Sequence, residues 1–212
     1  MKALVIGATG ATGKELVQVL LNHPSYTAVV LFVRRPTGIV HPRLTEVLTD
    51  FDKPEEVAGC IKGDVLFSCL GTTLKAAGTR EKQWHIDYEI PANFAAIAKA
   101  NGVTGLVLLS AYGASSSGRV FYSRLKGQLE EYITRLAFNQ LVIFRPGLLL
   151  RKNTDRWGER ASAAVLHFLN KLGLIRQFRP MPTLLLAEKL AKAPGAFATG
   201  KHIIELDKIF AC

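Results

Sequence analysis

The chain has few cysteines and no long apolar run. Its three cysteines, Cys60, Cys69 and Cys212, form an odd set without metal-ligand spacing, which argues against a disulfide framework and for a reducing compartment. No apolar stretch approaches the roughly 20 residues that a membrane span needs. No signal-peptide core, repeat, linker or low-complexity segment is visible either. We therefore expect a single cytoplasmic domain, 1–212, with no metal site.

Acidic residues are also scarce. The chain has 27 Lys and Arg against 17 Asp and Glu, a formal net charge of +10 at pH 7. Residues 151–201 hold ten of the basic residues and only three acids. Such a field attracts an anionic substrate or an acidic protein partner, although a solvated surface is the simpler interpretation. No basic stripe interleaved with aromatics is present, so we expect no nucleic-acid partner.

The first fourteen residues predict a nucleotide site. An apolar run, residues 3–6, is typical of a central parallel strand. Gly7, Gly10 and Gly13 follow at a spacing of three, and a helical pattern begins there. In this context the first glycine turns the chain, the second admits a pyrophosphate and the third lets helix and strand pack closely. The first helical turn then faces the phosphates, with contacts expected from Thr9, Ala11 and Thr12. An ordinary strand-to-helix turn is the alternative.

The end of the second expected strand, 28–33, indicates which nucleotide is bound. An NAD site usually places an acid at this point, to hold a ribose hydroxyl. Here Arg34 and Arg35 follow the strand, and Arg34 lies 21 residues after Gly13. A guanidinium pairs with a 2′-phosphate, which an acid would repel. The sequence therefore predicts NADP(H) in preference to NAD(H), unless these are solvated loop charges.

Two further strand ends extend the expected site. Asp50 and Phe51 follow strand 44–48, where they would meet the adenine, while Asp52 is a candidate N-cap for a helix over 53–61. Strand 64–70 ends at Leu70, and the small residues Gly71 and Thr72 come directly after it. A small residue there lets the cofactor ribose pass close to the backbone.

The remaining pattern alternates helix and strand and predicts an α/β fold with a doubly wound parallel sheet. Its ligand should bind beyond the carboxyl ends of the strands. We expect residues 148–212 to add a small cap on the substrate side. The other expected elements are a loop over 74–79, a helix over 80–101 interrupted at Pro91, a strand at 106–110, a Gly- and Ser-rich loop over 112–119, a helix over 121–136, a strand at 141–144, helices over 160–172 and 183–192, and a strand at 202–206.

Three residues have the chemistry for proton transfer at a carbonyl or alcohol. Tyr122 and Lys126 are four apart, so they share one helix face, and Ser110 ends the preceding strand. A tyrosine with its ordinary pKa near 10 is a poor base at neutral pH, and a nearby ammonium lowers that value. The serine would orient the substrate oxygen. Tyr112 is the rival tyrosine, but it has no lysine four residues on. A half-buried aromatic at a helix start is the bland alternative for Tyr122.

These residues resemble the atypical branch of the short-chain dehydrogenase/reductase superfamily, whose members have the Rossmann fold. The runs CLGTT, FYSRLKGQLE and FRPGLLL look especially like the Tat-interacting oxidoreductase subgroup and its bacterial relatives. The resemblance covers about residues 1–150. It implies NADPH bound at Gly7, Gly10, Gly13 and Arg34, Leu70 and Gly71 along the cofactor, Pro146, Gly147 and Leu148 against the nicotinamide carboxamide, and Ser110, Tyr122 and Lys126 as catalytic residues.

One position departs from the family pattern. Where many members have a helix asparagine, this chain offers Asp87, with Asn93 later on the same helix.

We expect an NADP(H)-dependent oxidoreductase acting on a carbonyl or alcohol of a small or lipophilic substrate. The alternative is an NADPH-binding redox sensor or adaptor with little turnover, which contacts a partner through residues 151–201; a flavin or quinone reductase is a weaker option. The substrate, the direction of reaction and the oligomeric state, a homodimer included, stay open.

Overall fold

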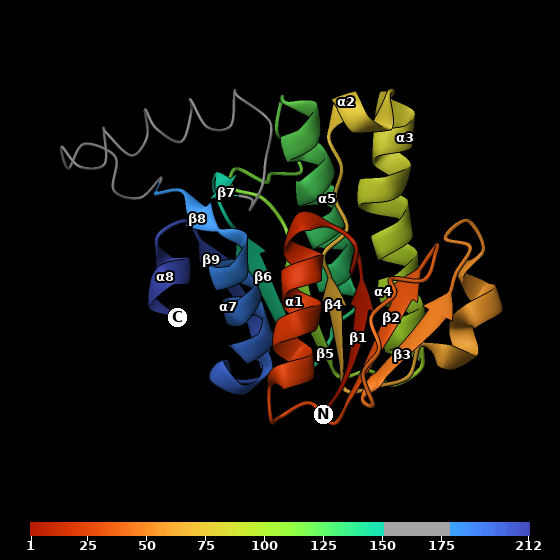
Figure 1. Ribbon diagram of the computed structural model, residues 1–212. Coiled ribbons are helices and arrows are strands. Elements are labelled where there is room, and N and C mark those ends of the chain that lie inside the picture. Colours follow the sequence, from red (N-terminus) through yellow and green to blue (C-terminus); the bar gives the residue numbers. More distant parts are fainter. Residues whose placement is uncertain (151–178) are drawn as a thin grey trace.

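The computed structural model describes residues 1–150 and 179–212. Their core is one seven-stranded parallel sheet in the order β3-β2-β1-β4-β5-β6-β9 (Figure 1). The predicted α/β fold with a doubly wound sheet is thereby confirmed. The strands are β1 Lys2–Ile6, β2 Ala28–Val33, β3 Leu44–Leu48, β4 Val65–Ser68, β5 Gly105–Leu109, β6 Gln140–Arg145 and β9 Gly200–Glu205.

The centre of the sheet is buried on both faces. Residues 3–6 of β1 have no exposed surface, which explains why this strand is a continuous apolar run. β1 pairs with β2 on one side and with β4 on the other. The strand order therefore reverses next to β1. A crevice opens at such a reversal, at the carboxyl ends of the strands, and parallel sheets bind ligands there.

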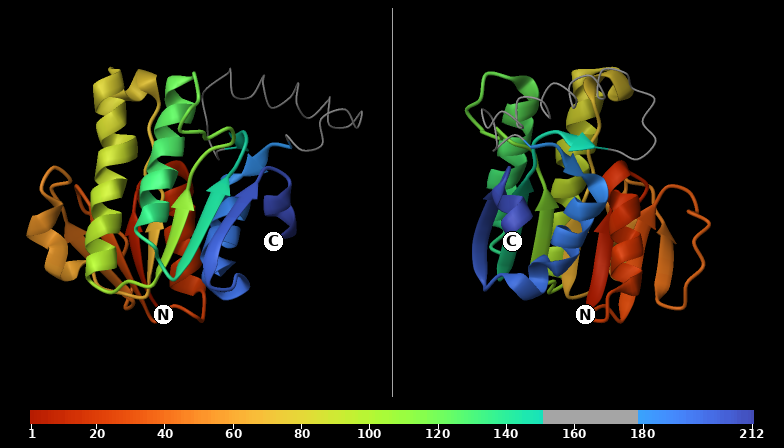
Figure 2. Two further views of the ribbon diagram at one scale, coloured as in Figure 1. Left: turned by 180° about the vertical axis from the view of Figure 1, so that it is seen from behind. Right: turned by 60° about the vertical axis from the view of Figure 1, so that its left-hand side comes forward.

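Helices cover both faces (Figure 2). α1 (Ala11–Asn22) and α7 (Thr183–Ala196) pack on each other and on one face. α4 (Ile90–Ala100) and α5 (Phe121–Arg135) pack on the other. Each face thus has its own apolar layer, and each fully buried Leu, Ile or Phe in it stabilises the fold by about 1.5–3 kcal/mol.

The stretch predicted as a helix over 80–101 has three parts. α3 (Arg80–Trp84) is followed by a π-helical turn, η2 (His85–Glu89), and then by α4. Pro91 stands in the first turn of α4 and has no N–H, so the carbonyl of Asp87 lacks its usual helical donor. The wider turn just before the proline accommodates this loss. The predicted interruption is confirmed, and it falls one turn earlier than Pro91 itself.

Two local predictions are right only in part. The helix over 53–61 is a 3₁₀ helix, η1 (Pro54–Cys60), and its N-cap is Lys53, not Asp52. Asp50 accepts the N–H of Asp52 at 3.0 Å, a local turn that a pattern of apolar spacing does not reveal. The loop over 74–79 contains a short helix, α2 (Leu74–Ala77), which Thr73 caps through its hydroxyl.

Part of the tail belongs to the main layers. The predicted last strand is β9, which pairs in parallel with β6, and α7 packs beside α1. β7 (Leu149–Leu150) pairs with β8 (Met181–Pro182), and α8 (Lys208–Ala211) ends the chain. The predicted helix over 160–172 and most of the basic stretch 151–201 lie outside the described residues, so the substrate-side cap stays a prediction. No helix in 1–150 or 179–212 is long and apolar enough to cross a membrane.

Candidate active site

The glycine loop between β1 and α1 leaves no room for side chains. Gly7 has a φ of +83°, and a Cβ there would lie 2.5 Å from the backbone carbon of Cys69 at the end of β4. A Cβ on Gly13 would lie 2.0 Å from the carbonyl oxygen of Gly7. Gly10 donates its N–H to the same oxygen at 3.0 Å. The turn is therefore compressed between a strand end and a helix start, as the glycine spacing predicts.

The start of α1 is built to meet an anion. Gly10 is the N-cap, and no side chain caps the first turn. The N–H groups at the start of a helix have no partner within the helix, and the helix dipole adds positive charge there. Ala11 and Thr12 follow Gly10 and line the cavity above the turn. These residues fit a pyrophosphate.

One cavity, of about 710 Å³, lies on the β2 side of the glycine loop. Arg34, Arg35, Asp50 and Phe51 all line it, so the structure brings together the four residues expected around the adenosine. The ring of Phe51 packs against the ring of Phe94, with 5.5 Å between the centroids. This contact holds the Phe51 ring in place as one wall of the cavity. The remaining lining residues are Gly7, Ala8, Thr9, Phe32, Val33, Pro36, Thr49, Asp52, Leu70, His85, Ile86 and Ile90.

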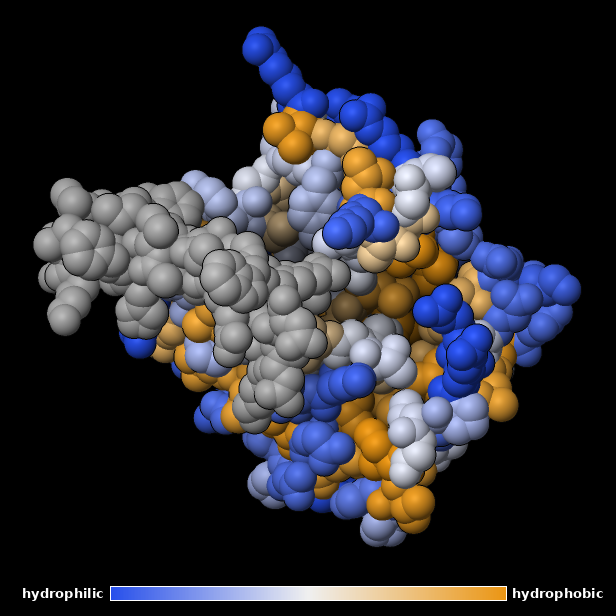
Figure 3. Space-filling model, turned by 45° about the horizontal axis from the view of Figure 1, so that its top comes forward, coloured by the Kyte–Doolittle hydropathy of each residue, from blue (hydrophilic) through white to orange (hydrophobic). Residues whose placement is uncertain are grey.

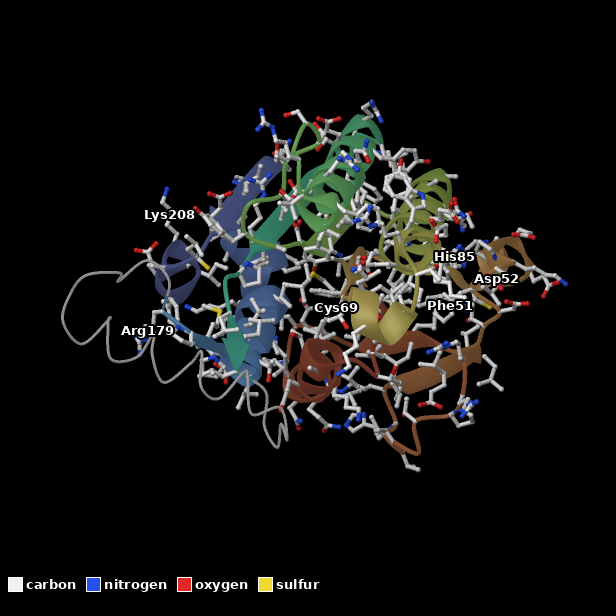
Figure 4. The ribbon with its side chains drawn as sticks, turned by 90° about the horizontal axis from the view of Figure 1, so that it is seen from above. Phe51, Asp52, Cys69, His85, Arg179 and Lys208 are labelled. Atoms are coloured by element: carbon white, nitrogen blue, oxygen red, sulfur yellow. The ribbon has the colours of Figure 1, made fainter. Side chains whose placement is uncertain are left out.

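His85 is a residue of this cavity that the sequence analysis missed. Its Nε2 lies 2.7 Å from Asp52 Oδ1 and its Nδ1 lies 2.7 Å from Glu89 Oε2. Figure 4 shows Asp52 and His85 close together at this end of the molecule. Only a doubly protonated ring donates to both carboxylates, and the Glu89 and Asp52 contacts accordingly raise the pKa of His85. The charged ring ties the loop after β3 to η2.

This ion pair predicts a pH-dependent contribution to stability. A histidine with a raised pKa in the folded state stabilises the fold below about 6.5, its ordinary value, and the contribution is lost as the pH rises through the folded-state pKa. We expect His85→Gln to lower Tm at acidic pH and to converge with the wild type in alkali. Thermal unfolding of both proteins across that range measures it. A Tm difference that grows with pH would contradict the assignment.

A second cavity, of about 330 Å³, lies on the other side of the glycine loop. Leu70 lines both cavities, so they lie next to each other at the end of β4. Figure 3 shows this hollowed face of the molecule, with hydrophobic residues in its depth. The lining residues are Ala11, Thr12, Cys69, Leu70, Gly71, Thr72, Thr73, Ala76, Leu109, Ser110, Tyr122, Lys126 and Leu149. All three predicted catalytic residues are among them.

Tyr122 and Lys126 lie on consecutive turns of α5, as their spacing predicts. Tyr122 is 37% exposed and Lys126 only 2%. The ammonium of Lys126 lies 5.8 Å from the centroid of the Tyr122 ring and donates to the carbonyl oxygen of Leu70 at 3.5 Å. The ammonium of Lys126 thus lies between the tyrosine ring and Leu70, the residue that lines both cavities.

Ser110 is held by a network that the sequence analysis did not find. Its hydroxyl donates to Glu130. Glu130 also accepts from Arg145 Nε at 3.0 Å, and Arg145 reaches Glu205 of β9 at 2.6 Å. These acids raise the pKa of Arg145, so the group is charged. Glu130 is four residues after Lys126, on the same helix face. That spacing is the one feature of the sequence that could have pointed to Glu130 as part of the site. The hydroxyl hydrogen of Ser110 points to Glu130, which leaves its lone pairs for a ligand.

Other residues singled out in the sequence lie elsewhere. Pro146, Gly147 and Leu148 do not line either cavity, although their neighbour Leu149 lines the second one. The carbonyl oxygen of Pro146 accepts the backbone N–H of Tyr112 at 3.0 Å. The rival tyrosine is not among the residues that line the second cavity. The contacts of Pro146, Gly147 and Leu148 with the nicotinamide carboxamide stay a prediction.

The cysteine and the helix polar residues have distinct environments. Cys69 lies in the middle of the molecule (Figure 4), and burial raises the pKa of its thiol to about 12, which suits a small buried residue. Asp87 is fully buried and accepts the N–H of Thr72, which lines the second cavity, whereas Asn93 is exposed. Within 1–150 and 179–212, no group of three or more His, Cys, Asp or Glu side chains is arranged to hold a metal ion.

A parallel sheet, a compressed glycine loop and two neighbouring cavities at the reversal of strand order define a dinucleotide-binding Rossmann protein. The chain belongs to the NAD(P)H-binding family, whose model matches residues 7–160. The predicted likeness to atypical short-chain dehydrogenases/reductases is confirmed. One solved structure with a similar fold is a short-chain dehydrogenase/reductase superfamily protein from Agrobacterium tumefaciens with bound NAD. The TM-score is 0.72 and the sequence identity 15%, and the match covers 97% of this chain and 77% of that one.

Two curated relatives are similar in sequence. "Protein FMP52, mitochondrial" of Eremothecium gossypii is 37% identical over 81% of this chain and 76% of its own length. "Protein HTATIP2" of Rattus norvegicus is 35% identical over 69% of this chain and 62% of its own length. MoeE5, solved with UDP-glucose and NAD, shares the fold at a TM-score of 0.74 with 15% identity, over 97% of this chain and 76% of that one.

The expected cytoplasmic location is wrong on this comparison. Several curated relatives, from Eremothecium gossypii, Candida albicans and Saccharomyces cerevisiae among others, are named as mitochondrial proteins. The expectation came from cysteine content and from the residues at the start of the chain. Neither distinguishes one reducing compartment from another.

Proposed function

We propose that this protein is an NADP(H)-dependent oxidoreductase that acts on a carbonyl or alcohol of a small or lipophilic substrate. The observation that carries the proposal is the second cavity. Ser110, Tyr122 and Lys126 line one space of about 330 Å³, which is next to the expected nucleotide cavity at Leu70. The candidate acid/base groups and the expected cofactor site are thus neighbours. Leu109, Ala76 and Leu149 give that cavity apolar walls, which suit a lipophilic substrate.

The residues of the cavity divide the chemistry between them. The nicotinamide, when bound, supplies or accepts the hydride. Tyr122 would donate a proton to the substrate oxygen during reduction, or accept it during oxidation. Lys126, buried beside the ring, would stabilise the phenolate and hold the nicotinamide ribose. Ser110 would accept a hydrogen bond from a substrate alcohol, because its own hydrogen is donated to Glu130.

We expect Arg34→Glu to reverse the cofactor preference. Arg34 and Arg35 stand at the end of β2 and line the adenosine cavity, where a guanidinium would meet a 2′-phosphate. The loss of one charge-assisted contact and the added repulsion should weaken NADPH binding by roughly 10²-fold and NADH binding far less. Fluorescence titration of both proteins with each nucleotide measures this. Equal losses for both nucleotides would remove Arg34 from phosphate recognition.

The function itself is tested by turnover. The purified protein would be given NADPH and a panel of aldehydes, ketones and quinones, and nucleotide oxidation would be followed by absorbance. Reduction of at least one compound above the rate of the Tyr122→Phe variant supports the proposal. Tight NADPH binding without any reduction contradicts it.

That second outcome would favour the other candidate, a cofactor-binding sensor or adaptor. One observation points to it: the Ser110 hydroxyl is already engaged by Glu130 and is not free to donate to a substrate carbonyl. Partner capture that depends on NADPH and survives Tyr122→Phe would be its signature. Residues 151–201 are its proposed contact surface.

A further inference from the structure

Asp87 is a fully buried carboxylate that the proposed proton chemistry does not use. It lies in the π-helical turn η2, and its Oδ1 accepts the N–H of Thr72 at 2.7 Å. Its Oδ2 has no hydrogen-bond partner among the described residues. A buried acid with an oxygen left over is costly, so its charge needs a compensating partner.

Lys126 is that partner. A Cβ placed on Gly71 would lie 3.8 Å from Lys126 Nζ and 4.0 Å from Asp87 Oδ1, so the two groups flank one point and are within about 8 Å of each other. In the described part of the chain they form no direct ion pair. They nevertheless interact: burial raises the pKa of the Asp87 carboxyl, and the Lys126 ammonium opposes that rise.

The other titratable groups around Lys126 are engaged or neutral. Burial raises the pKa of the thiol of Cys69, which follows β4, to about 12, so it is neutral at working pH. Glu130, on α5 itself, is ion-paired with Arg145 from β6, which also pairs with Glu205 of β9. Of the two buried acids among the described residues, Asp87 is the one that no cation contacts directly.

We propose that Asp87 is a positioning residue: it holds Lys126 as a buried counter-ion and offsets the positive field that Lys126 exerts on Tyr122. This deepens the proposed function, because it rests on Tyr122 as the acid/base. An asparagine of the same shape would hold Thr72 equally well but would leave the ammonium unopposed. The aspartate thus makes the phenolate harder to form than the same site with an amide.

The test removes the charge of Asp87 and keeps the shape of its side chain. We expect Asp87→Asn to lower the titration midpoint of the Tyr122 phenol by about one pH unit, because a carboxylate at this range opposes the phenolate. Near-ultraviolet absorbance of phenolate measures it, as the difference between each protein and the same protein carrying Tyr122→Phe. The control is Glu81→Gln, which removes the same charge from an exposed position on α3. It should leave the midpoint where it is.

No shift in Asp87→Asn would overturn the proposal, since a purely structural role at Thr72 is kept by the amide. If that variant does not fold, Asp87→Ser removes the same charge with a smaller side chain and gives the same reading. In the reduction of a substrate from the panel, activity is lost where the proton-donating phenol ionises, so the alkaline limb of the pH–rate profile should move to lower pH with the phenol. The titration needs no turnover. If the protein reduces no compound, the proposed function is contradicted, and the titration still decides the Asp87 proposal.

Discussion

Tyr122→Phe is expected to lower turnover by about 10²- to 10⁴-fold while NADPH binding stays within a few fold of the wild type. The substitution removes the hydroxyl that would exchange a proton with the substrate oxygen. It keeps the ring, against which the Lys126 ammonium lies at 5.8 Å, so the lysine and the cavity keep their shape. The measurement is steady-state reduction by NADPH, paired with a fluorescence titration of each protein.

The matched control is Tyr112→Phe. Tyr112 is the rival tyrosine, 47% exposed, and does not line the cavity. It should turn over like the wild type. Normal turnover in Tyr122→Phe, or a comparable loss in Tyr112→Phe, would remove the acid/base role from Tyr122.

The second large effect is expected at the glycine loop. Gly13→Ala introduces a Cβ 2.0 Å from the carbonyl oxygen of Gly7, which real structures do not tolerate, so α1 must move away from the end of β1. Overpacking of this kind costs roughly 1–3 kcal/mol of unfolding free energy. The same displacement moves the N–H groups that face the pyrophosphate, and NADPH binding should fall by at least about 10²-fold.

Gly195→Ala is the control for this change. Gly195 is also helical, in α7, and a Cβ there meets nothing within 4 Å. An alanine in a helix is favoured over glycine by about 1 kcal/mol, so this variant should be as stable as the wild type or slightly more. Chemical denaturation and nucleotide titration of both variants give the comparison. Wild-type binding in Gly13→Ala would show that the loop does not hold the cofactor.

Much of the fold was predictable because its signals are local. The strands of the sheet centre are apolar runs bounded by glycine or proline, and β2 and β3 have the predicted bounds. The position of β9 beside β6 depends on pairing between residues about 60 apart, such as Ile143 and Ile203. Periodicity along the chain cannot give such a partner. The sequence therefore predicts a strand at 202–206 but not its place in the sheet beside β6.

In the candidate site, too, residues with a local signal were predicted and residues defined by distant partners were not. Arg34, Asp50 and Phe51 were found because each follows a strand end, and parallel strands bring those ends to one edge. His85 and Glu130 were missed because their importance comes from partners on other elements, Asp52 for one and Ser110 and Arg145 for the other. A helical position alone does not distinguish such residues from solvated surface charges.

A crystal structure with NADP⁺ would show whether one cofactor occupies both cavities. We expect one extended molecule through both of them, with the adenosine 2′-phosphate at Arg34, the pyrophosphate over the start of α1, and the nicotinamide ribose within hydrogen-bond distance of Lys126. A nicotinamide directed away from Tyr122, or a nucleotide bound outside these cavities, would contradict it.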